Sequence, residues 1–249
     1  MILAANQPYF LPYIGYWQLI RAADVFLIGD DYQYKTRSWI SRNRILQHGK
    51  PAWFGIEIEK ASCSRLCTEL HTAPANWKKK RNILYDAYHK APYYRDGIRL
   101  VEEIRDCDET VLSEFLLHSI RTVCRYLQIG TPIARTSDFE GNGAYRRQER
   151  IYDLCRRLGA DTYINPIGGV ALYDFAKFRQ QGITLKFLRA DEIVYKQFDD
   201  SFIPNLSILD LIMFNSREEV ISMLDRYKLV TDQSFLTKWR TVSHETDGV

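Results

Sequence analysis

Charged side chains are missing from the first twenty residues of the chain. About twenty apolar residues suffice to cross a bilayer, so this gap raises the question of a membrane span. Pro8 and Pro12 argue against it because proline breaks a helix, and the amides of Asn6 and Gln7 would lack hydrogen-bond partners in lipid. A basic segment and a small-residue cleavage site, which mark a secretory signal, are also missing. We therefore expect a strand, a loop and the start of a helix here, and no membrane span.

Cysteine and net charge are scarce as well. The 249 residues include five cysteines, an odd number at irregular spacing, and carry a formal net charge of +3. Reduced thiols without a secretory signal predict a cytoplasmic protein. The near balance of charge gives no reason to expect nucleic acid as the main partner. The sixteen tyrosines and five tryptophans favour instead a site for a small molecule, such as a sugar or a nucleotide sugar.

Two familiar catalytic patterns are also lacking. Cys63, Cys67 and His71 stand at helical spacing, but a zinc site needs a fourth ligand, so we predict no metal site. The remaining histidines have no carboxylate or nucleophile near them in sequence that would suggest a Ser-His-Asp or Cys-His arrangement. The sequence leaves open the role of these two cysteines and His71, and the oligomeric state.

Short apolar runs alternate with segments of helical period. Strands are expected at residues 1–5, 24–31, 53–58, 132–135, 162–164 and 184–188, and helices from Gly15 onward and at residues 77–94, 110–127 and 146–158. This alternation predicts an α/β fold with a mostly parallel, Rossmann-like sheet and helices on both faces. We expect one domain over residues 1–231 and a polar tail over residues 232–249. Ligands of such sheets bind beyond the carboxyl ends of the strands.

The loops after the first two predicted strands hold most of the candidate binding residues. Amides, guanidinium groups and aromatic rings gather there, and guanidinium forks bind phosphate or carboxylate while an indole stacks on a base or sugar. A glycine would let a ligand approach the start of the next helix. A rigid proline turn and a solvated charged loop are the structural alternatives. The candidates are Gln7, Tyr9, Pro12, Gly15, Gln33, Arg37, Trp39, Arg42, Asn43 and Arg44.

Two later loops add further candidates. Asn165 turns the chain after a strand, and Gly168 and Gly169 make room for a ligand before Tyr173 leads into a helix. Ser207 and Asp210 fit a capping box ahead of an apolar run. Capping is one role for Ser207, and binding of an anion at the capped helix start is another.

Six stretches of the sequence resemble the WbqC-like protein family. They are QPYFLPYIGY at residues 7–16, DDYQY at 30–34, RSWISRNRI at 37–45, YINPIGG at 163–169, LYD at 172–174 and NLSILD at 205–210. The resemblance runs from residue 1 to about residue 227. That family is met in bacterial gene clusters for O-antigen and other surface polysaccharides, so the resemblance implies a pathway more than a reaction.

The opening of the chain is also similar, more distantly, to nucleotidylyltransferases and pantothenate synthetase. In those enzymes a histidine-x-glycine-histidine element begins the first helix and holds the triphosphate. Tyr13-Ile14-Gly15-Tyr16 stands at that place here, and residues 205–220 resemble a late serine-rich phosphate-binding element. Both histidines are absent, and a neutral phenol does not supply the positive charge of an imidazolium. The likeness therefore implies the fold more than the reaction.

Three functions follow as hypotheses. The first is a cytosolic transferase of surface-polysaccharide biosynthesis that modifies a nucleotide-linked amino sugar or joins a small acyl or aminoacyl unit to it, with Asp31 as the general base. The second is nucleotidylyl transfer to a sugar phosphate or small acid, with Tyr16 and Ser207 near the triphosphate and Mg²⁺ supplying charge. The third is a non-catalytic ligand-binding protein on the same fold. A nucleotide or nucleotide-activated donor is the cosubstrate we expect.

Overall fold

The computed structural model describes residues 1–36, 38–59, 65–74, 76–199 and 201–231. The candidate residue Arg37, the cysteine Cys63 and the predicted polar tail at residues 232–249 lie outside the described residues. In the part of the chain that is described, no helix is both long enough and apolar enough to cross a bilayer.

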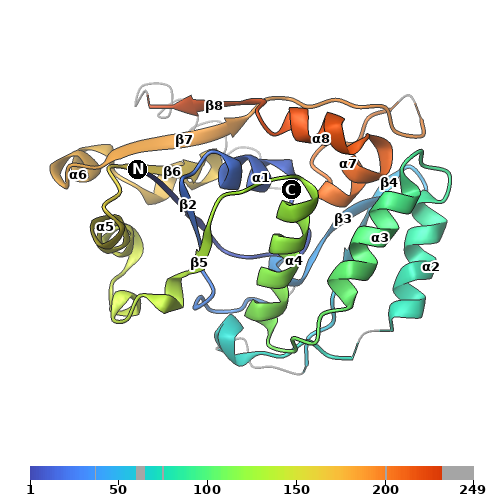
Figure 1. Ribbon diagram of the computed structural model, residues 1–249, viewed down its shortest axis with the longest axis horizontal. Helices are drawn as coiled ribbons and strands as arrows, with labels where there is room; N and C mark the ends of the chain where they lie inside the picture. Colours follow the sequence, from blue (N-terminus) through green and yellow to red (C-terminus); the bar gives the residue numbers. More distant parts are fainter. Residues whose placement is uncertain (37, 60–64, 75, 200, 232–249) are drawn as a thin grey trace.

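A six-stranded sheet forms the centre of the molecule, with the strand order β5-β2-β1-β6-β7-β8 (Figure 1). All neighbouring strands run parallel except β7 and β8. Its strands are β1 (Ile2–Asn6), β2 (Val25–Ile28), β5 (Ile133–Arg135), β6 (Thr162–Pro166), β7 (Thr184–Ala190) and β8 (Tyr227–Val230). The predicted α/β fold with a mostly parallel sheet is confirmed.

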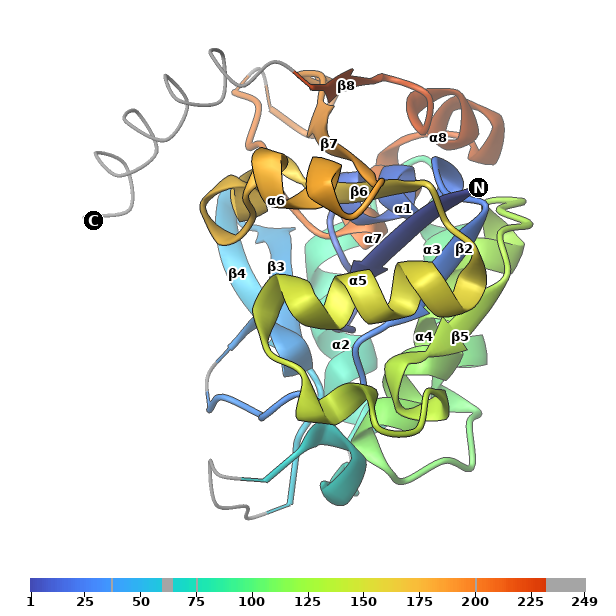
Figure 2. The ribbon, with the colours of Figure 1, turned by 90° about the vertical axis from the view of Figure 1, so that its left-hand side faces the viewer.

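Helices cover both faces of this sheet, because apolar side chains alternate between the faces along each strand. Ala4 and Ile164 pack into one core with α1, α4 and α7, whereas the adjacent Leu3 and Tyr163 pack into a second core with α5 and α6. Figure 2 shows α5 and α6 in front of the sheet and α2, α3 and α4 behind it. The helices are α1 (Ile14–Arg21), α2 (Trp77–Tyr88), α3 (Tyr94–Arg105), α4 (Leu112–Tyr126), α5 (Arg147–Leu158), α6 (Phe175–Gln180), α7 (Ile208–Phe214) and α8 (Arg217–Met223).

A separate antiparallel hairpin consists of β3 (Arg42–Gln47) and β4 (Lys50–Gly55). The sequence did not predict β3, because polar residues occupy four of its six positions and only Ile45 and Leu46 are both apolar and buried. Two further predictions were wrong at their edges. The strand expected at residues 53–58 begins and ends three residues earlier, and the helix expected at residues 77–94 ends at Tyr88, after which α3 begins at Tyr94.

The strand order fixes where a ligand can bind. From β1 the chain passes through α1 to β2 and on to β5 at one edge, and it then returns to place β6 on the other side of β1. Such a reversal leaves a crevice beyond the carboxyl ends of the two central strands, where α/β folds bind their ligands. Here those ends are Asn6 and Pro166.

Gly159 ends α5 in the left-handed conformation, with φ of 68°. We expect Gly159→Ala to lower the free energy of unfolding by about 1–2 kcal/mol, because a Cβ is unfavourable in this backbone region. An added Cβ there meets no atom within 4 Å, so crowding would not contribute. Urea denaturation measures the change. Gly130→Ala is the matched control, since its Cβ is equally free and its backbone is not left-handed; equal stability of the two variants would contradict the prediction.

Candidate functional site

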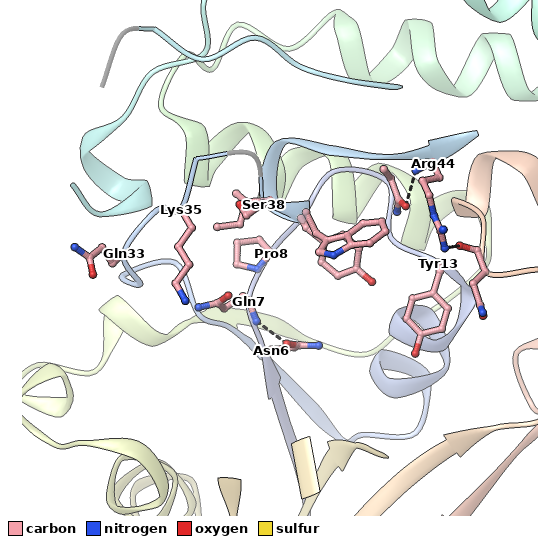
Figure 3. Close-up of a pocket in the computed structure, with 13 residues that line it drawn as sticks. Asn6, Gln7, Pro8, Tyr13, Gln33, Lys35, Ser38 and Arg44 are labelled. Atoms are coloured by element: carbon pink, nitrogen blue, oxygen red, sulfur yellow. Dashed lines mark hydrogen bonds between the residues drawn. The ribbon is translucent and has the colours of Figure 1, made fainter. Parts of the chain in front are cut away.

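A cavity of about 580 Å³ lies beyond the carboxyl end of β1, between the first loop and the β3–β4 hairpin (Figure 3). We call it the β1 cavity. Two cations, Lys35 and Arg44, line it, and none of its thirteen lining residues is acidic. In Figure 3 the Lys35 side chain extends toward Gln7, and Arg44 and Tyr13 lie at the opposite end. The other lining residues are Asn6, Pro8, Tyr9, Gln33, Ser38, Trp39, Ile40, Asn43 and Asn205.

Aromatic rings hold the guanidinium of Arg44 in place. It lies 5.4 Å from the ring centroid of Trp39, and its Nη2 donates to the carbonyl oxygen of Asn205 at 3.3 Å. The Trp39 and Trp53 rings are 4.9 Å apart, and the guanidinium of Arg42 lies 4.1 Å from the Trp53 ring. Arginine and tryptophan side chains therefore stack together at the hairpin. Trp39 keeps 45% of its surface exposed, which leaves its ring accessible to a ligand.

Hydrogen bonds fix the first loop between β3 and α7. The carbonyl oxygen of Leu11 accepts from Asn43 Nδ2 at 2.7 Å and from Ser207 Oγ at 2.8 Å. The backbone amide of Ser207 donates to the carbonyl oxygen of Arg44, and the carbonyl oxygen of Pro12 accepts from the amide at the start of α7. Asn43 is only 3% exposed, so it lies beneath the loop and offers the cavity little surface.

A second cavity of about 410 Å³, the β6 cavity, lies across the carboxyl ends of β1 and β6. Asn6 and Gln7 line both this cavity and the β1 cavity. Asn165, on the β6 side, accepts a hydrogen bond from the buried hydroxyl of Tyr163 at 3.2 Å. A Cβ at Gly169 would come within 1.9 Å of Asn165 Nδ2, so the glycine makes room for that amide and not directly for a ligand. Gly168 and Tyr173 complete the predicted residues at this cavity.

A third cavity, of about 830 Å³, lies beside the start of α5, and we call it the α5 cavity. Asp31 lines it and forms an ion pair with Arg150 at 2.5 Å, while the Thr136 hydroxyl donates to the same carboxylate at 2.7 Å. The sequence predicted arginines beside Asp31, but the cation that pairs with it comes from α5 and not from the second loop. A substrate proton would have to reach a carboxylate whose oxygen atoms already accept from Arg150 and Thr136.

Five predicted site residues lie in the interior and line none of these three cavities. The pKa of Tyr16 is raised by burial, and Ser207 caps α7 by accepting from the amide of Leu209 at 3.2 Å. Pro12 and Gly15 are buried, and the Tyr13 ring covers Gly15 so closely that a Cβ there would be 2.4 Å from its hydroxyl. The five residues are Pro12, Gly15, Tyr16, Ser207 and Asp210, and they belong to the packed interior beneath the cavities.

Asp210 does not form the expected capping box with Ser207. Its carboxylate accepts hydrogen bonds from Tyr88 at 2.7 Å, from Tyr195 at 2.5 Å and from Gln197 at 2.9 Å, and none of its surface is exposed. Burial raises the pKa of Asp210, and the hydrogen bonds from these donors oppose that rise. The carboxylate therefore joins α2, α7 and the segment before α7 inside the core.

The structure thus brings together part of the predicted set. Gln7, Tyr9, Gln33, Trp39, Asn43 and Arg44 line the β1 cavity. Arg42 lies against the Trp53 ring and lines none of the three cavities. Sequence reasoning missed Asn205 and the arginines of the α5 cavity, because Arg146–Arg150 was interpreted only as the polar beginning of a helix. Three positive charges within five residues, after a loop that follows a strand, were the available signal.

Cys67 and His71 do not form a metal site with other residues in the part of the chain that the structure describes. Cys67 is buried, and burial raises the pKa of its thiol to about 11. His71 Nδ1 lies 3.3 Å from the hydroxyl of Thr110. A thiol with such a pKa stays protonated at neutral pH and is a poor ligand or nucleophile.

Comparison with known proteins gives one family and one relative. The model of the WbqC-like protein family matches residues 7–222. An uncharacterized protein of Mycobacterium tuberculosis, Rv1507c, is 28% identical over 214 residues, which cover 84% of this chain and 92% of the relative. No solved structure matches the chain.

Two buried tyrosines test the assignment of interior residues. The Tyr16 hydroxyl has no hydrogen-bond partner among the described residues, whereas the Tyr88 hydroxyl donates to Asp210 and accepts from the amide of Leu46. We expect Tyr88→Phe to lower the free energy of unfolding by about 1–3 kcal/mol, because it removes a partner of a buried carboxylate. Tyr16→Phe should leave stability unchanged or raise it. Urea denaturation of both variants measures this, and a larger loss in Tyr16→Phe would refute the assignment.

Proposed function

This chain belongs to the WbqC-like protein family, and we propose that it is a transferase of bacterial surface-polysaccharide biosynthesis. Its substrate would be a nucleotide-linked amino sugar, which it modifies or to which it joins a small acyl or aminoacyl unit. This proposal rests on the residues that line the β1 cavity. The family resemblance supports the pathway, and the chemistry of the cavity supports the class of ligand.

The β1 cavity suits an anionic ligand with a planar or sugar-like part. Lys35 and Arg44 offer positive charge for a carboxylate or phosphate, and no lining carboxylate opposes it. The rings of Tyr9 and Trp39 offer surfaces for stacking on a sugar or base. Amide groups, among them that of Gln7, can both donate to and accept from hydroxyl groups. The volume of about 580 Å³ lies within the usual range for small-molecule sites.

Group transfer requires that two ligands meet, and the crevice offers a place for this. Asn6 and Gln7 line both the β1 and the β6 cavity, so a ligand in each would approach the other at the end of β1. Asp31 remains the candidate general base, because its carboxylate lies at the neighbouring α5 cavity.

The strand order favours a second candidate, nucleotidylyl transfer. With β5, β2, β1, β6 and β7 in that order, the parallel part of the sheet has the arrangement of the dinucleotide-binding folds. The tyrosines at the two expected histidine positions weaken this candidate. Tyr16 is buried in the core, and Tyr13 covers Gly15 at the start of α1, so neither presents a charged group to a triphosphate.

A thermal-shift screen tests the first candidate. The probes are UDP-N-acetylglucosamine, acetyl-CoA, glutamate and ATP with Mg²⁺. We expect at least one anionic probe to raise the melting temperature, by about 5 °C or more near a hundred times its dissociation constant. For the probes that carry a small acid or an acyl unit, glutamate and acetyl-CoA, Lys35→Gln combined with Arg44→Gln should abolish that rise. Lys50→Gln, at an exposed position at the start of β4 outside the cavity lining, is the control and should leave it unchanged.

The products of incubation separate the three functions. Transfer of an acyl or aminoacyl unit to the sugar supports the first candidate. Release of pyrophosphate from a nucleoside triphosphate and a sugar phosphate supports the second. Recovery of every bound probe unchanged supports a binding protein, and the absence of any stabilising probe would count against a small-molecule site at the β1 cavity.

A further inference from the structure

The α5 cavity is the strongest unassigned feature of the molecule. It is formed by the loop after β2, the turn Asn142–Ala144, the start of α5 and the segment that leads into α6. Arg146, Arg147 and Arg150 line it together with a single carboxylate, that of Asp31. Three aromatic rings, those of Tyr32, Tyr145 and Tyr173, complete its polar and aromatic wall. The combination of cations and rings in a cavity of about 830 Å³ indicates a ligand that is both anionic and aromatic.

The floor of this cavity is the ion pair between Arg150 and Asp31, which carries no net charge. Arg150 is almost fully buried, and its guanidinium binds Asp31 while its Nε donates to Asn142 Oδ1 at 2.6 Å. The same guanidinium lies 4.9 Å from the ring centroid of Tyr32. Because Asp31 balances its charge, Arg150 positions the wall and adds no net charge to the cavity.

The excess positive charge of the α5 cavity comes from Arg146 and Arg147. Both side chains are exposed, and among the described residues no carboxylate forms a salt bridge with either one. They differ in this from Arg156 and Arg157 of the same helix, which both pair with the buried Asp153. Two adjacent guanidinium groups without carboxylate partners at the mouth of a cavity match the oxygen atoms of a phosphate or diphosphate.

The α5 cavity is continuous with the rest of the crevice. Tyr32, Ile151, Leu172 and Tyr173 line both it and the β6 cavity, which shares Asn6 and Gln7 with the β1 cavity. Gln33 lines the α5 cavity and the β1 cavity. A ligand whose phosphates lie at the arginines can therefore extend over the sheet edge toward a second ligand in the β1 cavity.

We propose that the α5 cavity binds the diphosphate of a nucleoside diphosphate or nucleotide sugar, with Arg146 and Arg147 on the phosphates and a tyrosine ring against the base. This inference rests on the proposed function and assigns its two ligands to different cavities. The nucleotide lies on the α5 side of the crevice, and the acyl, aminoacyl or other small acid lies on the β1 side, near Lys35 and Arg44.

Calorimetric titration of the full chain with pyrophosphate, UDP and UDP-N-acetylglucosamine tests this assignment. We expect Arg146→Gln combined with Arg147→Gln to weaken binding of all three by about tenfold or more, and added salt to weaken wild-type binding. Arg95→Gln combined with Arg99→Gln, two exposed arginines of α3 that line none of the three cavities, is the matched control and should change affinity less than twofold. Tighter binding of UDP-N-acetylglucosamine than of UDP would identify the nucleotide sugar as the ligand, and the reverse would identify the free nucleotide.

Two outcomes would overturn the inference. One is equal affinity of the Arg146 and Arg147 double variant and the wild type, including the case in which neither binds pyrophosphate or UDP. The other is loss of UDP binding in the Lys35 and Arg44 double variant alone, which would place the diphosphate in the β1 cavity and leave the proposed transferase function standing. If the α5 arginines bind UDP but no small acid or acyl donor binds at the β1 cavity, this inference stands and the proposed function fails.

Discussion

The carbonyl oxygen of Leu11 is the point at which three distant segments of the chain are joined. It accepts hydrogen bonds from Asn43 on β3 and from Ser207 at the start of α7, and all three residues are buried. A buried carbonyl without partners is unfavourable, so the first loop can stay in this position only while the hairpin and α7 pack against it. The β1 cavity depends on this joint, because its lining residues come from the same loop and hairpin.

The positively charged side chains of the crevice lie at its two ends, in the β1 cavity and in the α5 cavity. The β1 cavity has lysine and arginine and no carboxylate, while the α5 cavity has one carboxylate that is already paired with Arg150. Both ends are therefore positive toward a ligand, and the middle, formed by Asn6, Gln7 and Asn165, is polar and uncharged. A crevice with two cationic ends and a neutral centre suits two anionic ligands whose reacting groups meet between them.

Much of the fold could be predicted from the sequence, since the parallel strands are short apolar runs and α4 and α5 have clear helical periodicity. The hairpin strand β3 could not, because four of its six residues are polar and its two apolar residues are adjacent, so no apolar–polar alternation is visible. Helix α3 was not predicted, and the helix expected at residues 77–94 extends past the end of α2 at Tyr88, since both helices are polar outside and no glycine separates them. Of the candidate site residues, Gln7, Trp39 and Arg44 line the β1 cavity, whereas the arginines of the α5 cavity were not recognised from the sequence.

The sequence by itself determined the parallel strands of the central sheet, the long helices α4 and α5 and which loops are polar, because periodicity and composition act locally. It could not determine which polar side chains face a ligand and which stay inside the protein. Ser207, Asp210 and Tyr16 have the same chemistry as residues of a site, yet packing of α1 and α7 against the core buries all three. The partner of Asp31 was likewise decided by tertiary structure, because Arg150 lies 119 residues away in sequence and reaches it only when α5 packs on the sheet.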